Sequence, residues 1–305
     1  MTSSVEITQG RTLADWATDR MLRAVIGVMR LLPYEKRVPA MGWFTRRFIA
    51  PLAGYNRRSA LNLSYIFPDM DRAERAAIVA QVADNAGRTF IENYSPDEFL
   101  ARNASASILG PGLAALKNAQ ASGKPVILVT GHFGNYEAPR AALVGLGYNV
   151  GGLYRPATNK FFNDHYAGTF TAYGGPIFAQ GHRGTAGFVR HLKAGGILVL
   201  LFDQHVKAGK RMNFLGRPAR TALSASELAL RYGAELIPFY GTRQPDGLSF
   251  AIELEAPIPH SDPVTMTRAM NASLEARILA NPSQWFWIHR RWKVGRMRKM
   301  LKNLG

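Results

Sequence analysis

An apolar run that ends in a glycine-flanked histidine, PVILVTGHFGNYE, occupies residues 125–137. A short, continuous apolar segment after a Gly-Lys turn predicts a strand that is buried on both faces. Gly131 and Gly134 permit a tight backbone turn, and Asn135 is a residue type that caps helices. The stretch therefore predicts a buried strand, a tight turn that carries His132, and a helix that begins near Tyr136.

The same strand-then-helix order continues on the C-terminal side. The apolar pattern predicts further strands at residues 149–154, 197–202, 235–242 and 249–255. It predicts helices at residues 136–146, 161–173, 183–194, 223–232 and 265–280. Strands that alternate with helices of this length indicate an α/β fold. We expect a central, largely parallel or mixed sheet with helices on both faces.

Residues 1–105 have a different pattern, which is helical throughout and is punctuated by prolines. One long helix is expected over residues 71–88, with Asp69 or Asp71 as its N-cap. We expect residues 1–105 to form a helical region that packs on the core and on a membrane surface. Residues 106–305 form the α/β core with a basic C-terminal helix, and the two parts make one structural unit.

Chemically reactive side chains follow three of the predicted strands. His132, Arg155 and Asp203 each lie just after a strand, and Gln204 follows Asp203. In open α/β sheets the ligand site lies beyond the carboxyl ends of the strands, so these side chains are expected to meet in one crevice. The alternative is a structural ion pair beneath the loops. His182 and His205 are interpreted as loop histidines.

The spacing between His132 and Glu137 permits a catalytic pair. If His132 precedes the helix and Glu137 opens it, the carboxylate can hold the imidazole tautomer and leave the other ring nitrogen as a general base. N–H groups at the helix start are then available to stabilise an oxyanion. The alternative is a loop histidine beside a glutamate that the helix dipole favours.

The composition limits the possible chemistry. The 305 residues include 38 Lys and Arg, 21 Asp and Glu and no cysteine, which gives a formal charge of +17. Without cysteine there is no disulfide, no Cys-ligated metal and no thiol catalysis. The positive charge predicts an anionic partner: nucleic acid, a membrane surface, an acidic protein or a phosphorylated substrate.

Most of this charge lies at the two ends of the chain. Residues 1–58 and 290–305 together hold thirteen of the seventeen excess positive charges. Apolar residues recur at helical spacing from Leu13 to Leu32 and from Val294 to Leu304, and basic amphipathic helices of this kind are typical of membrane interfaces. The alternative is two helices packed on the domain with solvated basic faces. No run of 18 apolar residues occurs, so neither a signal peptide nor a spanning helix is expected.

An aromatic and basic block, QWFWIHRRWK, occupies residues 284–293. Such a block can stack nucleic-acid bases, line a lipid-facing cleft or simply pack against the sheet edge. The sequence contains no P-loop, no G-x-S-x-G elbow and no H-E-x-x-H motif. These three interpretations stay open at the level of sequence.

Taken in order, these motifs resemble the bacterial lipid A biosynthesis (lauroyl/myristoyl) acyltransferase family, within the HX4(D/E) glycerolipid acyltransferase superfamily. The GHFGNYE segment matches the HX4(D/E) motif. Further matches are YRP at 154–156 with Asn159, LFDQ at 201–204, FLGRPA at 214–219 with Thr221, Gly233-Ala234 with Pro238, Asn62-Leu63 with Phe67-Pro68, and the 284–293 block. The resemblance runs from about residue 20 to residue 293.

The resemblance implies an acyltransferase that moves a fatty acyl chain from an acyl-carrier-protein thioester to a hydroxyl of a phosphorylated glucosamine lipid, a lipid A precursor. His132 would be the general base and Glu137 would orient it, with no metal, no cofactor and no covalent intermediate. The substrate-binding residues would be Asn135, Arg155, Asp203, Gln204 and Arg217. The expected partners are acyl carrier protein, the glycolipid acceptor and an anionic membrane surface, but not nucleic acid.

The resemblance also implies a location and leaves alternatives. The protein is expected at the cytoplasmic face of the cell inner membrane, peripheral or anchored at its N-terminus. Arg23 and Arg30 interrupt the N-terminal apolar segment, which favours a peripheral helix. The acceptor could instead be another glycolipid, such as a phosphatidylinositol mannoside, or a lysophospholipid. A non-catalytic basic protein that binds a membrane surface or nucleic acid is the alternative from another class.

Overall fold

The computed structural model describes residues 12–157 and 159–294. Its centre is a seven-stranded sheet with the order β1-β9-β8-β2-β5-β3-β4. The strands are β1 (Ile108–Leu109), β2 (Val126–Thr130), β3 (Val150–Tyr154), β4 (Ile177–Ala179), β5 (Ile197–Leu201), β8 (Glu235–Arg243) and β9 (Phe250–Leu254). Within this sheet only the β8–β9 pair is antiparallel. The expected largely parallel sheet is confirmed.

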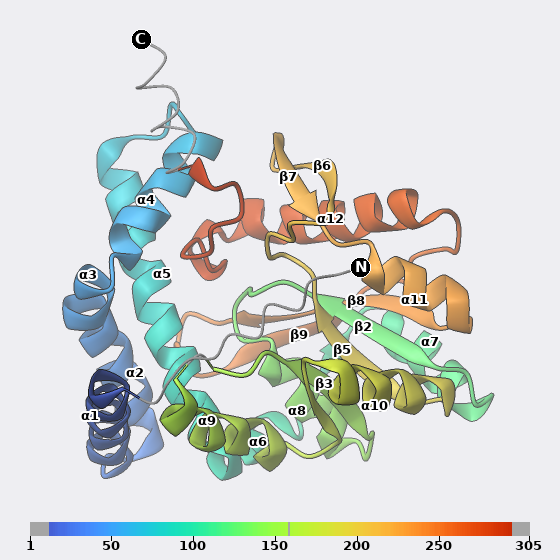
Figure 1. Cartoon of the computed structure of the whole chain (residues 1–305), viewed down its shortest axis with the longest axis horizontal. Coiled ribbons are helices and arrows are strands. Elements are labelled where there is room, and N and C mark those ends of the chain that lie inside the picture. The colour runs from blue at the N-terminus through green and yellow to red at the C-terminus, as the bar shows by residue number, and fades with distance from the viewer. Residues whose placement is uncertain (1–11, 158, 295–305) are drawn as a thin grey trace.

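Helices cover both faces of the sheet (Figure 1). The helices that follow the strands are α7 (Gly112–Ala121), α8 (Glu137–Gly145), α9 (Lys160–Ala172), α10 (His182–Lys193), α11 (Ser224–Tyr232) and α12 (Pro263–Ala280). The five helices predicted at 136–146, 161–173, 183–194, 223–232 and 265–280 are present, with ends within two residues of the prediction. The prediction did not include α7.

The N-terminal part is helical, as predicted. It contains α1 (Leu13–Arg30), α2 (Tyr34–Phe44), the π-helix η1 (Thr45–Ile49), α3 (Ala50–Leu52), α4 (Tyr55–Ile66), α5 (Arg72–Asn93) and α6 (Pro96–Asn103). The segments from α1 to α5 stand together along one side of the molecule (Figure 1). Asp71 caps α5 by accepting hydrogen bonds from the N–H groups of Ala73 and Glu74.

Four strands, β1, β4, β6 and β7, were not predicted, because their sequences carry no clear strand signal and β1 has only two residues. Strand β4 has three residues, and the hairpin of β6 (Lys210–Phe214) and β7 (Arg217–Thr221) is rich in polar residues. The hairpin turn is Leu215-Gly216, where both residues have positive φ. The Leu215 N–H donates to Glu275 Oε1 at 2.8 Å, a contact with α12 that only the tertiary structure supplies.

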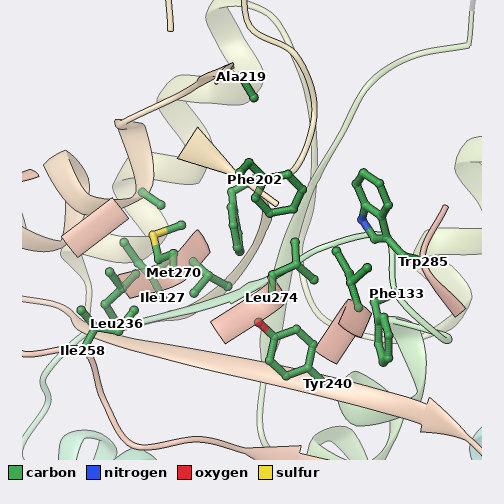
Figure 2. Packing of buried hydrophobic residues seen from close by; sticks show 14 of the residues in the cluster. Ile127, Phe133, Phe202, Ala219, Leu236, Tyr240, Ile258, Met270, Leu274 and Trp285 are labelled. Atoms are coloured by element: carbon green, nitrogen blue, oxygen red, sulfur yellow. The ribbon is translucent and has the colours of Figure 1, made fainter. Parts of the chain in front are cut away.

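The central strand β2 divides the core into two clusters. Ile127 and Val129 face one cluster, and Val126 and Leu128 face the other, as the alternation of side chains along a strand requires. Figure 2 shows part of the first cluster, in which Met270 and Leu274 of α12 belong to the same group of buried side chains as Ile127. All five residues of β2 are buried, so this strand is a rigid base for the turn that follows it.

The aromatic block at 284–293 packs into the core. Trp285, Trp287 and Trp292 are buried and lie in contact with one another. The segment runs beside the loop after β2, where the Phe286 N–H donates to the backbone oxygen of His132 at 2.9 Å. Of the three interpretations of this block, packing against the sheet is therefore the one that the structure shows.

The helix α1 is docked on the core by polar contacts. Arg23 pairs with the buried Asp19, at 2.8 Å from Nε to Oδ1, and donates to the backbone oxygen of Phe161 at the start of α9. Asn159 donates to the backbone oxygen of Asp15 at 2.7 Å. None of the helices within residues 12–157 and 159–294 combines the length and the apolar character needed to span a bilayer. The C-terminal helix predicted beyond Val294 lies outside the described residues.

Candidate active site

Strand register brings a histidine and an aspartate together. Strands β2 and β5 are parallel neighbours, and Thr130 is paired with Leu201 at their carboxyl ends. His132 and Asp203 each follow two residues later, so they leave the sheet side by side. The distance from His132 Nδ1 to Asp203 Oδ1 is 2.7 Å, and the His132 backbone N–H donates to Asp203 Oδ2, also at 2.7 Å.

The Asp203 carboxylate is completely buried and surrounded by donors. Besides the two contacts from His132, Trp285 Nε1 donates to Asp203 Oδ2 at 2.9 Å. Burial alone would raise the Asp203 pKa, but the neighbouring imidazole and these hydrogen bonds hold it well below its usual range. The carboxylate is therefore ionised at neutral pH, fixes the orientation of the His132 ring and leaves Nε2 as the nitrogen that can accept a proton.

Glu137 is placed differently from the expectation. Its carboxylate pairs with Arg140 one turn later on α8, at 3.0 Å from Nη1 to Oε2, and both side chains are buried. Arg140 also donates to the backbone oxygens of Val150 and Gly174. The carboxylate that is hydrogen-bonded to His132 is thus Asp203 and not Glu137, which the sequence suggested because five residues separate it from the histidine.

The Asn135 side chain makes hydrogen bonds that hold the loop between β2 and α8. Its Oδ1 accepts from the Glu137 N–H at 2.9 Å, and its Nδ2 donates to Glu92 Oε2 at 2.7 Å. The side chain is fully buried, so the expected substrate-binding role is not matched by a place on the cavity wall. The N-cap position of α8 is Tyr136 and not Asn135 as predicted, although Asn135 still accepts from the first N–H of the helix.

Backbone donors of this loop are already engaged. The N–H groups of Gly134, Asn135, Glu137 and Ala138 each donate to a protein oxygen. Gly134 has a φ of +53°, and a Cβ at this position would lie 2.0 Å from the backbone oxygen of Gly241. The loop is therefore tightly held, and these four groups do not supply the oxyanion site that the sequence suggested.

A cavity of about 470 Å³ opens over the His132 ring. One part is apolar and is formed by residues of β3, β4, β5 and α9, including Leu153, Phe170, Ile177 and Val199. The other part is polar, and its exposed side chains are Arg155, Gln204 and Lys207. Glu137 and Arg140 also line the cavity. The arrangement suits a substrate with a long apolar chain and an anionic group.

The cavity wall includes His205 but not Arg217, which was expected to bind substrate. Arg217 does not line this cavity: its Nε donates to the backbone oxygen of Tyr65 at 3.1 Å, and its guanidinium lies over the Tyr65 ring. His205 lies in the loop after β5, as its interpretation as a loop histidine predicts, and it lines the cavity. Within the described part of the chain, no group of three or more His, Cys, Asp or Glu residues gathers that could hold a metal ion.

Three residues that shape the site, Arg140, Trp285 and His289, were not predicted. Arg140 was predictable, because it lies three residues after Glu137 on the same helix face. Trp285 and His289 were not, because the 284–293 block comes about 150 residues after His132 in the chain. The His289 ring lies edge-on to the His132 ring, with 4.4 Å between centroids.

The profile of the family described as "Bacterial lipid A biosynthesis acyltransferase" matches residues 7–294. The chain is 27% identical over 245 residues to the lipid A biosynthesis lauroyltransferase of Escherichia coli strain K12, covering 76% of this chain and 77% of that protein. It is 25% identical over 245 residues to a lipid A biosynthesis acyltransferase of Haemophilus influenzae, with 76% and 73% covered. It is 22% identical over 289 residues to the lipid A biosynthesis myristoyltransferase of Escherichia coli strain K12, with 90% and 85% covered. Since the profile spans nearly the whole chain, this protein belongs to the bacterial lipid A biosynthesis acyltransferase family and is an acyltransferase.

Proposed function

We propose that the protein transfers a fatty acyl chain from an acyl-carrier-protein thioester to a hydroxyl of a lipid A precursor, a late acylation in lipopolysaccharide biosynthesis. His132 is the general base, and Asp203 orients it. The observation that carries this proposal is the 2.7 Å contact between His132 Nδ1 and the buried Asp203 carboxylate, beneath a cavity with apolar and cationic parts.

The proposed step is direct acyl transfer. His132 Nε2 takes the proton of the acceptor hydroxyl while the hydroxyl oxygen attacks the thioester carbonyl carbon. The carbon–sulfur bond of the tetrahedral intermediate then breaks, and the imidazolium returns its proton to the leaving thiolate. A thioester is already activated for acyl transfer, so we propose that the step uses no metal and no bound cofactor.

The carboxylates of the site have separate roles in this proposal. Asp203 stabilises the imidazolium that forms as the base takes its proton. Glu137 neutralises the buried Arg140, and the pair forms a rigid part of the cavity wall. This assignment replaces Glu137 by Asp203 as the residue that orients His132.

The cavity accounts for both substrates. The apolar part between β3, β5 and α9 holds the acyl chain, because burial of each methylene stabilises the complex by about 0.8 kcal/mol. Arg155, Gln204 and Lys207 at the mouth bind the phosphate groups of the donor or of the acceptor. The excess positive charge of the chain favours encounter with an acidic carrier protein.

The protein is proposed to act peripherally at the cytoplasmic face of the inner membrane. Leu13, Met21 and Val28 of α1 are exposed, so this helix presents apolar side chains in a chain of net charge +17. A basic surface with exposed apolar side chains favours binding to an anionic bilayer.

The first prediction tests the dyad. Replacing His132→Ala should lower kcat by about 100-fold to 10,000-fold, the usual contribution of a general base. Asp203→Asn should also lower kcat strongly because it removes the charge that stabilises the imidazolium. Glu137→Gln should lower activity less than either change. Acyl transfer is measured by mass spectrometry with purified acyl carrier protein thioesters and a lipid A precursor.

The controls test the general base, the orienting carboxylate and the acceptor separately. Arg217→Gln, outside the cavity, should keep kcat within about threefold, the size of a surface change. Full activity of His132→Ala would contradict the base assignment, and a larger loss in Glu137→Gln than in Asp203→Asn would return the orienting role to Glu137. Activity only with a lysophospholipid or another glycolipid would overturn the proposed acceptor.

A further inference from the structure

A second basic cavity lies on the outer side of the N-terminal helices. We call it the α4–α5 groove: a cavity of about 720 Å³ between α4 and the first turns of α5, to which η1 adds one residue. Four arginines line it, namely Arg46, Arg57, Arg72 and Arg75. The remaining wall is largely apolar and includes Leu61 and Val79. The groove thus combines concentrated positive charge with an apolar floor.

The arginines of this groove are not held in salt bridges within the described residues, although Arg75 is close enough to Asp71 for their charges to interact. Among the ion pairs of the described residues, none involves these four arginines. Arg75 donates through Nη2 to the Met70 backbone oxygen at 2.7 Å, but its buried Nε has no hydrogen-bond partner. A guanidinium N–H that is buried without a partner is costly, and an anion in the groove would satisfy it.

Exposed apolar side chains flank the groove residue Arg46 in the sequence. Trp43, Phe48 and Leu52 lie on the α2–η1–α3 segment, close in sequence to Arg46, and are 50%, 43% and 89% exposed. The Trp43 and Phe48 rings are in edge contact, and Arg47 lies over the Phe48 ring. Tryptophan, phenylalanine and arginine together are typical of the membrane–water interface. This neighbourhood favours a lipid over a soluble anion.

The groove is separate from the catalytic cavity. The two share no lining residue, and the opposite face of α4 packs on the aromatic block, where Asn62 donates to the backbone oxygens of Trp287 and His289. Figure 1 shows α3, α4 and α5 at the side of the molecule formed by the N-terminal helices. A ligand in the groove therefore does not touch the reacting atoms.

We propose that the α4–α5 groove binds the phosphate group of an anionic bilayer phospholipid, while Trp43, Phe48 and Leu52 enter the interface beside it. Guanidinium groups bind phosphate with charge-assisted, bidentate hydrogen bonds, and the apolar floor accepts the first part of the lipid chains. The site holds the enzyme on the bilayer in a fixed orientation. This inference rests on the proposed membrane association but not on the acyl-transfer chemistry.

The test uses the full chain and sedimentation with vesicles of phosphatidylcholine, alone or with phosphatidylglycerol. The groove variant is Arg46→Gln/Arg57→Gln/Arg72→Gln, and within the described residues these three side chains make no hydrogen bond or ion pair. The control, Arg190→Gln/Arg211→Gln/Arg268→Gln, removes the same charge from exposed positions on α10, β6 and α12. Each arginine near an anionic surface changes affinity by about fivefold, so the groove variant should bind phosphatidylglycerol vesicles about 100-fold more weakly. The control should lose no more than about threefold, because charges far from the bilayer are screened.

The outcomes separate the possible occupants. Equal losses in both variants would show that net charge alone acts and would overturn the groove. Acyl transfer to detergent-dispersed acceptor should be unchanged in the groove variant. A raised KM for the carrier-protein thioester or for the acceptor in that assay, with vesicle binding intact, would assign the groove to that substrate and overturn the lipid site. Failure of the parent protein to bind these vesicles would reject the membrane association itself, whereas loss of transfer would concern only the chemistry.

A fluorescence signature checks the orientation. Trp16 and Trp43 are partly exposed, whereas Trp285, Trp287 and Trp292 are buried. In a Trp16→Phe background, phosphatidylglycerol vesicles should shift the tryptophan emission to shorter wavelength, and the additional change Trp43→Phe should abolish that shift. A shift that persists without Trp43 would contradict the proposed orientation.

Discussion

At the scale of single residues, His289 shows how the site controls protonation next to its base. Burial first, and then the charge of the nearby His132, lower the pKa of His289 to about 3. Its Nε2 is buried and has no hydrogen-bond partner among the described residues. The ring is therefore neutral at the pH at which His132 works, and it adds no positive charge beside the imidazolium that forms during the reaction.

This environment predicts a pH dependence of stability. In the unfolded chain His289 has a pKa of about 6.5, so the unfolded state binds a proton that the folded state rejects as the pH falls below this value. Between pH 7 and pH 5 the free energy of unfolding should fall by about 2 kcal/mol through this residue. The low pKa of Asp203 acts in the same direction, but only near and below its ordinary value of about 4.

Urea unfolding at pH 7 and pH 5 measures this effect. The variant His289→Phe keeps an aromatic ring but cannot be protonated, so its loss of stability over this range should be smaller than that of the parent protein by about 2 kcal/mol. The same pH dependence in both proteins would show that His289 is not the group responsible.

At the scale of elements, a buried ion pair joins α5, β8 and the catalytic loop. Arg243 on β8 makes two contacts to the Glu92 carboxylate on α5, at 2.6 and 2.7 Å. Glu92 also accepts from Asn135, which holds the start of α8 through the Glu137 N–H. Because both charges are buried, removal of one leaves the other unpaired.

The predicted cost of breaking this pair is large. Glu92→Gln or Arg243→Met should each lower the free energy of unfolding by about 3–5 kcal/mol. The double variant should lose less than the sum, because neither charge is then left alone. Arg102→Gln, which breaks an exposed pair with Glu35, should cost less than about 1 kcal/mol. Urea titrations check these values, and equal small effects at the two pairs would contradict the linking role.

At the scale of the whole molecule, stability is expected to be uneven. Within the described residues, α1 buries only Asp19 and Ile26, whereas all five residues of β2 are buried. Regions with few buried contacts open at low free-energy cost. The docking of α1 through Arg23 and Asn159 is therefore expected to be reversible, while the sheet and the dyad stay folded.

Native-state hydrogen exchange tests this gradient. Amides of α1 should exchange through local opening, with little dependence on low urea concentration, and those of β2 should exchange only on global unfolding. Arg23→Gln, which removes the contact to Phe161, should speed exchange in α1 and leave β2 unchanged. Protection of α1 equal to that of β2 would show that the helix is part of the central cooperative unit.

Much of the architecture was determined by the sequence itself. The apolar run before His132, the alternation of strands and helices, and the cap at Asp71 depend on local periodicity and backbone preference, which are properties of neighbouring residues. These features predicted the parallel sheet and placed His132 at the end of a strand. The short β4 and the polar β6–β7 hairpin carry no such signal, and contacts with other elements stabilise them.

The partner of His132 was decided only by the tertiary structure. Glu137 is the nearer carboxylate in sequence, but on α8 it meets Arg140, whereas Asp203 comes 71 residues after His132 and contacts it. The pairing of Thr130 with Leu201 places these two side chains at the same sheet edge. Strand register and the path of a distant chain segment such as 284–293 result from packing of the whole molecule, and local sequence spacing does not contain them.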